Sequence, residues 1–200
     1  MLVHVRNALG VKDPSTDIDA KLKRSKRTLE AVDEFCFSRH WMMHVGPSKG
    51  EILTRSLVEA VNRKLDDTKA STTPFVVLEL GAYCGYSTIL MARVMLERMK
   101  QNDALKGHVI TTEINPESMR IANSLVRMSG LEDMISINQI YFNGVETNVV
   151  EVAQEAIQHR DEAKEIDFLF IDHDKVRRHG IDFLYLSPPS FNSREGFLLA

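Results

Sequence analysis

The sequence has little of what marks several large protein classes. Only two cysteines, Cys36 and Cys84, occur in 200 residues, which leaves no disulfide framework and no cysteine-based metal spacing. No apolar run approaches the roughly 18 residues of a membrane-spanning helix, and the N-terminus lacks the apolar core of a signal peptide. Lys and Arg total 25 against 28 Asp and Glu, so the basic excess typical of nucleic-acid binding is absent. We therefore expect a cytoplasmic protein that binds neither nucleic acid nor membranes.

What the sequence does contain is an alternation of strand and helix patterns, with 44% apolar residues to build a core. Short apolar or β-branched runs predict strands at 75–80, 108–112, 134–140 and 167–171. Helical spacing of apolar residues begins at Thr28 and returns at 49–65, 87–100, 115–129 and 145–160. This alternation predicts an α/β fold with a Rossmann-like, doubly wound, mostly parallel sheet. We divide the chain into a polar N-terminal lead-in, residues 1–27, and a domain, residues 28–200.

The first polar feature at a predicted strand end is E-L-G-A-Y-C-G-Y-S, residues 79–87. Ligands of open α/β sheets bind beyond the carboxyl ends of the strands. Gly81 would let the chain turn sharply off the strand, and Gly85 would let backbone approach a ligand closely. Neither G-x-G-x-x-G nor a P-loop lysine is present, which disfavours a nicotinamide cofactor or a nucleoside triphosphate.

The second feature is Glu113, which closes the second predicted strand. A carboxylate at this place can accept both hydroxyls of a ribose. It also fits a simpler interpretation, an acidic residue near the N-terminus of the next helix. Taken with the glycine turn, Glu113 predicts a site for an adenosine-type ligand without phosphates, which points to S-adenosylmethionine.

The third feature is D-H-D-K, residues 172–175, directly after the fourth predicted strand. Asp172 suits a metal ligand or a cofactor contact, and Lys175 can act as a base if its pKa is lowered. Asp172 and Asp174 also fit the Asp-x-Asp of a phosphohydrolase or of a glycosyltransferase. An exposed loop without a chemical role is a further interpretation.

The fourth feature, H-W-M-M-H-V-G at residues 40–46, precedes the first predicted strand. Local rules favour a helix end that is packed by Trp41 and closed by Gly46. A functional interpretation folds the segment over the cofactor as an apolar lid, with Met43 near the sulfonium.

The segment V-L-E-L-G-A-Y-C-G-Y-S at 77–87 resembles the cofactor motif of catechol O-methyltransferases. The resemblance covers about residues 28–176 and includes W-M-M-H-V-G at 41–46, K-G at 49–50, E-I-N-P at 113–116 and D-H-x-K at 172–175. It implies a class I S-adenosylmethionine-dependent methyltransferase with bound Mg²⁺, which methylates a hydroxyl of a small catechol or phenol substrate.

The resemblance also implies roles for individual positions. Asp172 would be a metal ligand, and Lys175 would be the general base that takes a proton from the catechol hydroxyl. Trp41, Met43 and Lys175 would contact the substrate. The cofactor-binding residues would be Met43, Val45, Glu79, Gly81, Tyr83, Ser87, Glu113, Ile114, Asp172 and His173.

Several positions depart from the family pattern. His44 stands where the family has asparagine, Asp174 stands where it has tryptophan, and residues 140–147 lack its Gly-x-Ser-Gln turn. Residues 176–193 depart from the family pattern, with a weaker resemblance at Tyr185 and Leu186, and we interpret them as an atypical insertion. We expect this sequence to lack the last strands and the remaining metal ligands of the family, because it reaches Ala200 about where the fifth strand of the family should begin. A non-catalytic form that binds S-adenosylmethionine is therefore an alternative to an active enzyme.

Overall fold

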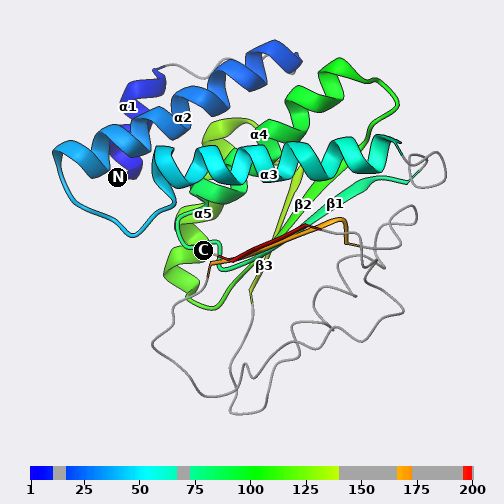
Figure 1. Ribbon diagram of the computed structural model, residues 1–200. Coiled ribbons are helices and arrows are strands. Elements are labelled where there is room, and N and C mark those ends of the chain that lie inside the picture. Colours follow the sequence, from blue (N-terminus) through cyan, green and yellow to red (C-terminus); the bar gives the residue numbers. More distant parts are fainter. Residues whose placement is uncertain (11–16, 67–72, 140–165, 173–195, 200) are drawn as a thin grey trace, which may run out of the picture.

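The computed structural model describes residues 1–10, 17–66, 73–139, 166–172 and 196–199. A parallel sheet lies against a layer of helices (Figure 1). The sheet has the order β3-β2-β1-β4-β5. Its strands are β1 (Phe75–Leu80), β2 (Gly107–Glu113), β3 (Ile135–Gln139), β4 (Phe168–Ile171) and β5 (Gly196–Leu199).

This strand order is that of a doubly wound sheet. The chain moves outward from β1 through β2 to β3, and it then returns to the other side of β1 for β4 and β5. A reversal of this kind opens a crevice at the carboxyl ends of the central strands. The predicted Rossmann-like α/β fold is thus confirmed, whereas the predicted helix at 145–160 and the insertion at 176–193 lie outside the described residues.

β1 occupies the centre of the sheet because its whole surface can be buried. Each of its six residues is withdrawn from solvent, and it pairs with β2 on one side and β4 on the other. A strand that is covered on both faces needs an apolar run rather than an alternating one, and Glu79 is the exception within β1. The observed bounds of β1 match the predicted run at 75–80.

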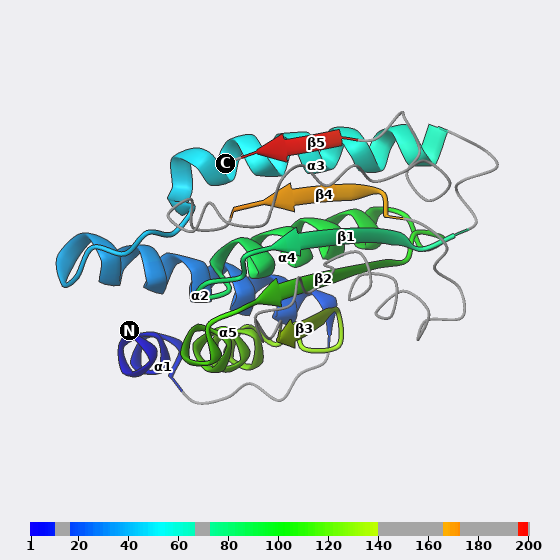
Figure 2. The same cartoon turned by 90° about the horizontal axis from the view of Figure 1, so that it is seen from below.

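The described helices lie on one face of the sheet (Figures 1 and 2). α4 contacts β2, α2 packs across α4 and α5, and α1 contacts α2 and α5. None of the helices in the described ranges is both long and apolar enough to cross a bilayer. Their bounds are α1 (Leu2–Leu9), α2 (Ile18–Ser38), α3 (Gly46–Asp66), α4 (Tyr86–Gln101) and α5 (Pro116–Ser129).

α2 begins at Ile18, ten residues before the predicted helical pattern. Asp17 caps it by accepting the N–H of Asp19 at 3.1 Å. Ser25 and Thr28 are fully buried, and their hydroxyls donate to backbone carbonyls of the same helix at 3.1 Å and 2.9 Å. Because these buried residues are polar, a search for apolar periodicity could not find this part of the helix.

The segment between α2 and α3 differs from the helix end that local rules favour. α2 ends at Ser38, and Gly46 starts α3 with a φ of +65° instead of closing a preceding helix. Trp41 is 76% exposed, so it does not pack against a helix end. Residues 40–45 instead form a non-helical stretch beside α2.

The far end of the described chain also differs from expectation. β5 pairs in parallel with β4, with Phe168 opposite Gly196 and Ile171 opposite Leu199. The fifth strand of the sheet is thus formed by residues 196–199, just before the place where we expected it to begin.

A buried ion pair joins the amino ends of β1 and β4. Lys64 of α3 donates to the carboxylate of Asp167 at 2.7 Å and to the carbonyl of Pro74 at 2.8 Å. Asp167 in turn accepts the N–H of Val76 at 2.7 Å. These contacts fix where α3, β1 and β4 start relative to one another.

Candidate functional site

The candidate site lies at the carboxyl ends of β1, β2 and β4, beginning with the loop after β1. This loop, residues 81–85, has positive φ values at Gly81 (+101°), Tyr83 (+47°) and Gly85 (+85°). The N–H groups of Gly81 and Ala82 both donate to the Thr112 carbonyl at 3.0 Å. The loop is therefore fixed to β2, and its two glycines adopt conformations that residues with a Cβ rarely take.

Gly85 makes a close approach of the predicted kind, but to a helix. A Cβ at this position would lie 3.1 Å from the Cα of Ala122 in α5. The glycine thus lets the loop and α5 share a tight contact. The predicted approach of its backbone to a ligand stays a prediction.

Glu113 is held between this loop and the start of α5. One carboxylate oxygen accepts the N–H of Tyr83 at 2.7 Å, and the other accepts the N–H of Asn115 at 2.8 Å. The residue is 8% exposed. A carboxylate oxygen can accept two hydrogen bonds, so each oxygen has room for one further donor. The two interpretations of Glu113 are thus compatible with each other. Its carboxylate supports the start of α5, and its oxygens can still accept hydrogen bonds from the two hydroxyls of a ribose.

Glu79 is buried below the loop and has three internal partners. Its carboxylate accepts hydrogen bonds from the hydroxyls of Ser87, Thr88 and Thr111. Burial raises the pKa of Glu79, and the three hydroxyls oppose that shift. Its carboxylate ties β1 to β2 and to the first turn of α4. Contact of Glu79 or Ser87 with a cofactor stays a prediction.

Asp172 follows β4 at the same edge of the sheet. Its N–H donates to the Leu80 carbonyl at 3.0 Å, and its side chain is close enough to Glu79 to raise the pKa of that carboxyl. Within the described ranges, no group of three or more His, Cys, Asp and Glu side chains could hold a metal ion. His173, Asp174 and Lys175 lie outside the described residues.

Exposed apolar side chains follow the strand ends and occupy the segment before α3. Tyr83 and Ile114, which follow β1 and β2, are 41% and 43% exposed. Trp41 and Met43 are also exposed, whereas Val45 is buried in the core. The structure therefore leaves four of the predicted contact residues with an apolar surface available to a ligand.

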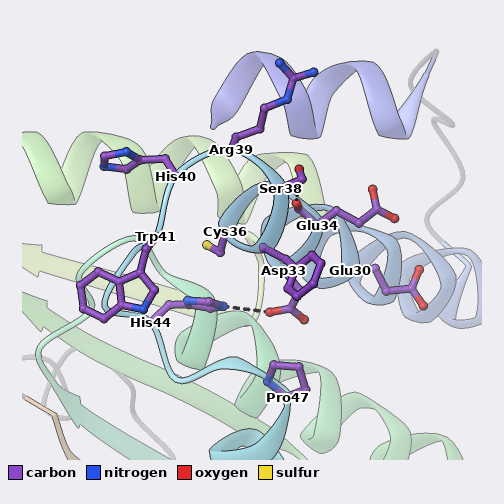
Figure 3. A pocket seen from close by; sticks show the side chains of 11 residues that line it. Glu30, Asp33, Glu34, Cys36, Ser38, Arg39, His40, Trp41, His44 and Pro47 are labelled. Carbon is purple, nitrogen blue, oxygen red and sulfur yellow. Dashed lines mark hydrogen bonds and ion pairs between the residues drawn. The ribbon is translucent and has the colours of Figure 1, made fainter.

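A hollow of about 930 Å³ opens between the end of α2 and residues 39–47 (Figure 3). Asp33 and His44 both line it, and the Nε2 of His44 lies 2.8 Å from Oδ1 of Asp33. The other oxygen of Asp33 accepts the O–H of Tyr86 at 2.9 Å. Tyr86 is the first residue of α4, so the cluster adjoins the loop after β1.

Sequence reasoning missed four residues of this region. Thr88 and Thr111 could have been suspected, because a hydroxyl in a buried helix or strand position needs an acceptor nearby. Asp33 and Tyr86 gave no such signal, since 53 residues separate them along the chain. Asp33 also lies in a helix that is rich in charged residues throughout.

Comparison with known proteins gives consistent matches. Residues 20–180 match the profile of the O-methyltransferase family. Catechol O-methyltransferase of Mus musculus is 32% identical over 161 residues, covering 79% of this chain and 49% of the relative. Catechol O-methyltransferase of Bos taurus is 31% identical over 150 residues, covering 74% and 44%. The chain thus spans about half the length of these relatives.

Two solved structures are among those similar to this chain. An O-methyltransferase from Bacillus cereus, in complex with SAH, has 23% identity and a TM-score of 0.43, covering 86% of this chain and 60% of that one. The O-methyltransferase TomG from Streptomyces achromogenes, in complex with SAM, has 16% identity and a TM-score of 0.41, covering 86% and 59%. Neither likeness decides a cofactor or a substrate for this chain.

The family assignment rests on the extent of the profile match. The match begins within α2 and extends beyond β4, so it leaves out β5 among the described strands. It includes the loop after β1, Glu113 and Asp172. On this match, the chain belongs to the O-methyltransferase family.

Proposed function

We propose that this protein binds S-adenosylmethionine at the carboxyl ends of β1 and β2 and transfers its methyl group to a hydroxyl of a catechol-type substrate. The observation that carries the proposal is the carboxylate of Glu113. It is fixed by two backbone N–H groups, and each of its oxygens has room for one more donor. The family match over residues 20–180 supports the same activity.

The surroundings of Glu113 fit an adenosine group. A ribose presents two neighbouring hydroxyls, and a carboxylate that is already oriented can accept both without rearranging. Ile114 directly follows Glu113 and is exposed, so it offers an apolar surface for the adenine ring. Tyr83 offers a second such surface on the loop after β1.

When bound, S-adenosylmethionine supplies a methyl group on a positively charged sulfonium, and transfer requires an oxygen nucleophile in line with that methyl group. The contribution of the protein is therefore mainly positioning. We propose that Met43 lies beside the methyl group and that Trp41 forms a wall of the substrate site. The proposed base, Lys175, lies outside the described residues.

Magnesium dependence is a separate part of the proposal. Mg²⁺ takes about six oxygen ligands in near-octahedral geometry and commonly uses one or two carboxylates. Asp172 is the proposed ligand, but the described ranges contain no group of three candidate ligands. These residues alone do not form a complete magnesium site, so we derive no step through the ion.

Binding of S-adenosylmethionine without turnover is the second candidate function. Except for His173, the proposed cofactor contacts lie among the described residues, and they could bind the cofactor whether or not Lys175 acts as a base. A phosphohydrolase built on Asp172 and Asp174 is less favoured, because the family match points to methyl transfer. We further propose a small-molecule substrate and a cytoplasmic location, with Cys36 and Cys84 as free thiols suited to a reducing compartment.

Calorimetry with S-adenosylhomocysteine, the demethylated product, tests binding. We expect Glu113→Ala to weaken affinity by at least about a hundredfold, since two hydrogen bonds to a charged group are worth about 1.5–3 kcal/mol each. The matched control is Glu117→Gln, an exposed acidic residue in the first turn of α5, which should leave affinity unchanged.

Transfer of labelled methyl from S-adenosylmethionine to a catechol, with Mg²⁺ or with EDTA, tests turnover. Product that forms only with Mg²⁺ supports the full proposal. Binding without product supports the non-catalytic form, and absence of binding by the folded wild-type protein overturns both.

A further inference from the structure

The ring of His44 has hydrogen-bond acceptors on both sides. Its Nε2 lies 2.8 Å from the carboxylate of Asp33, and its Nδ1 lies 3.2 Å from the backbone carbonyl of Met42. A neutral imidazole carries one N–H, so it can donate to only one of these acceptors. The imidazolium carries two and donates to both. The geometry therefore favours a positively charged ring.

The ring is also enclosed by an aromatic neighbour that shares Asp33. Tyr86 donates its O–H to the second oxygen of Asp33 at 2.9 Å, and its ring meets that of His44 edge-on, with centroids 4.9 Å apart. The side chains of His44 and Asp33 are 11% and 26% exposed. In Figure 3 the imidazole points at the Asp33 carboxylate between α2 and residues 40–45.

The cluster connects the segment before α3 to the proposed cofactor site. Tyr86 directly follows the loop of residues 81–85, and the N–H of Tyr83 in that loop holds Glu113. His44 lies between Met43 and Val45, both of which are proposed cofactor contacts. A contact at His44 therefore fixes neighbouring parts of one site.

The charges around His44 agree with this assignment. The hydrogen bond to Asp33 raises the pKa of His44, burial opposes the shift, and the Met42 carbonyl adds to it. Glu30 and Glu34, which line the same hollow, both contact Arg27. The titratable or charged groups of the hollow and the cluster are Glu30, Asp33, Glu34, Cys36, Arg39, His40 and Tyr86.

We propose that His44 is a positioning residue, which as an imidazolium clamps residues 42–45 to Asp33 and Tyr86 and thereby holds Met43 and Val45 in place for S-adenosylmethionine. The inference rests on the proposed function, because it assigns a role to these residues in the same site. Loss of the proton from His44 would release one of its two hydrogen bonds and loosen the segment.

The direction of the pH effect follows from the cluster. The pKa of His44 is raised in the folded protein above its ordinary value of 6.5. The two hydrogen bonds of the imidazolium therefore hold the segment fully at a pH below 6.5, and one of them is lost as pH rises through the pKa of His44 in the folded protein. We expect affinity for S-adenosylhomocysteine to fall about tenfold between about pH 6 and about pH 9, a typical size for coupling between two sites.

Two measurements on the wild-type protein test the proposal. Calorimetry with S-adenosylhomocysteine across this pH range measures the change in affinity. Hydrogen exchange at residues 41–45 without ligand, corrected for the intrinsic pH dependence of exchange, measures the clamp by itself. The affinity and the exchange rate should both change with pH, and their midpoints should equal the pH at which NMR shows the His44 ring to titrate.

Variants then assign the effect to His44. His44→Asn retains an amide donor but does not titrate, so its affinity should vary little with pH and should stay below the wild-type value at about pH 6. His40→Asn replaces an exposed histidine of the same segment and should retain the wild-type pH profile. Tyr86→Phe removes only the hydroxyl and should move the midpoint of the His44 titration.

The outcomes separate the two proposals. Affinity that stays constant across the pH range, with exchange at 41–45 also unchanged, overturns the clamp and leaves the proposed function intact. Absence of binding at every pH overturns the proposed function, whereas pH-dependent exchange at 41–45 would still support the clamp. The wild-type measurements decide the matter even if His44→Asn does not fold.

Discussion

The two ends of the central strands treat charge in opposite ways. At the amino ends of β1 and β4, Lys64 and Asp167 neutralise each other in a buried ion pair. At the carboxyl ends, Glu79 and Glu113 are held by hydroxyls and backbone N–H groups, which carry no full charge. The amino ends thus form a closed structural contact, while the carboxyl ends keep negative character and acceptors for a ligand.

The largest expected effect comes from opening the closed end. Lys64→Met should lower the free energy of unfolding by roughly 3 kcal/mol, because it removes the Lys64 ammonium from the buried carboxylate of Asp167. Urea denaturation followed by circular dichroism measures this loss. Lys64→Met combined with Asp167→Leu should recover part of it, and a double variant as unstable as the single one would contradict the explanation.

At the carboxyl ends, Glu79 should make stability depend on pH. Its pKa is raised in the folded protein above the ordinary 4.5, so the folded state binds more protons than the unfolded state between these two values. Stability should therefore fall as pH rises from about the ordinary value through the folded pKa.

Glu79→Gln tests this dependence, since it keeps the shape but cannot ionise. Unfolding midpoints measured across the pH range should show a smaller slope than in the wild type. An unchanged slope would show that another group causes it.

The smallest effect should come from a single hydroxyl donor. Thr88→Val keeps the shape of the side chain and removes one of the three hydrogen bonds to Glu79, which should cost about 1 kcal/mol of stability. Thr54→Val, a half-buried threonine of α3, is the matched control. If the two variants lose the same free energy of unfolding, the hydrogen bond from Thr88 to Glu79 makes no specific contribution to stability.

The sequence predicted those parts of the molecule that depend on short-range patterns. The run at 75–80 is β1 as expected, and Glu113 lies beside the loop after β1 because parallel strands end at one edge. Burial of Ser25 escaped prediction, because apolar periodicity does not detect polar residues that bond to their own helix.

Contacts between distant segments escaped prediction for another reason. Asp33 meets His44 across 11 residues and Tyr86 across 53, and in neither case does one helix or strand connect the two residues. The sequence marked His44 only as a departure from the family pattern. Its partners Asp33 and Tyr86 belong to α2 and α4, which pack against each other.

The tight contact between Gly85 and Ala122 has a consequence for how this family member can change. A side chain at position 85 would press on the backbone of α5, the helix whose start lies beside Glu113. A larger residue at position 122 would press back on the loop in the same way. In related sequences we therefore expect these two positions to covary in size.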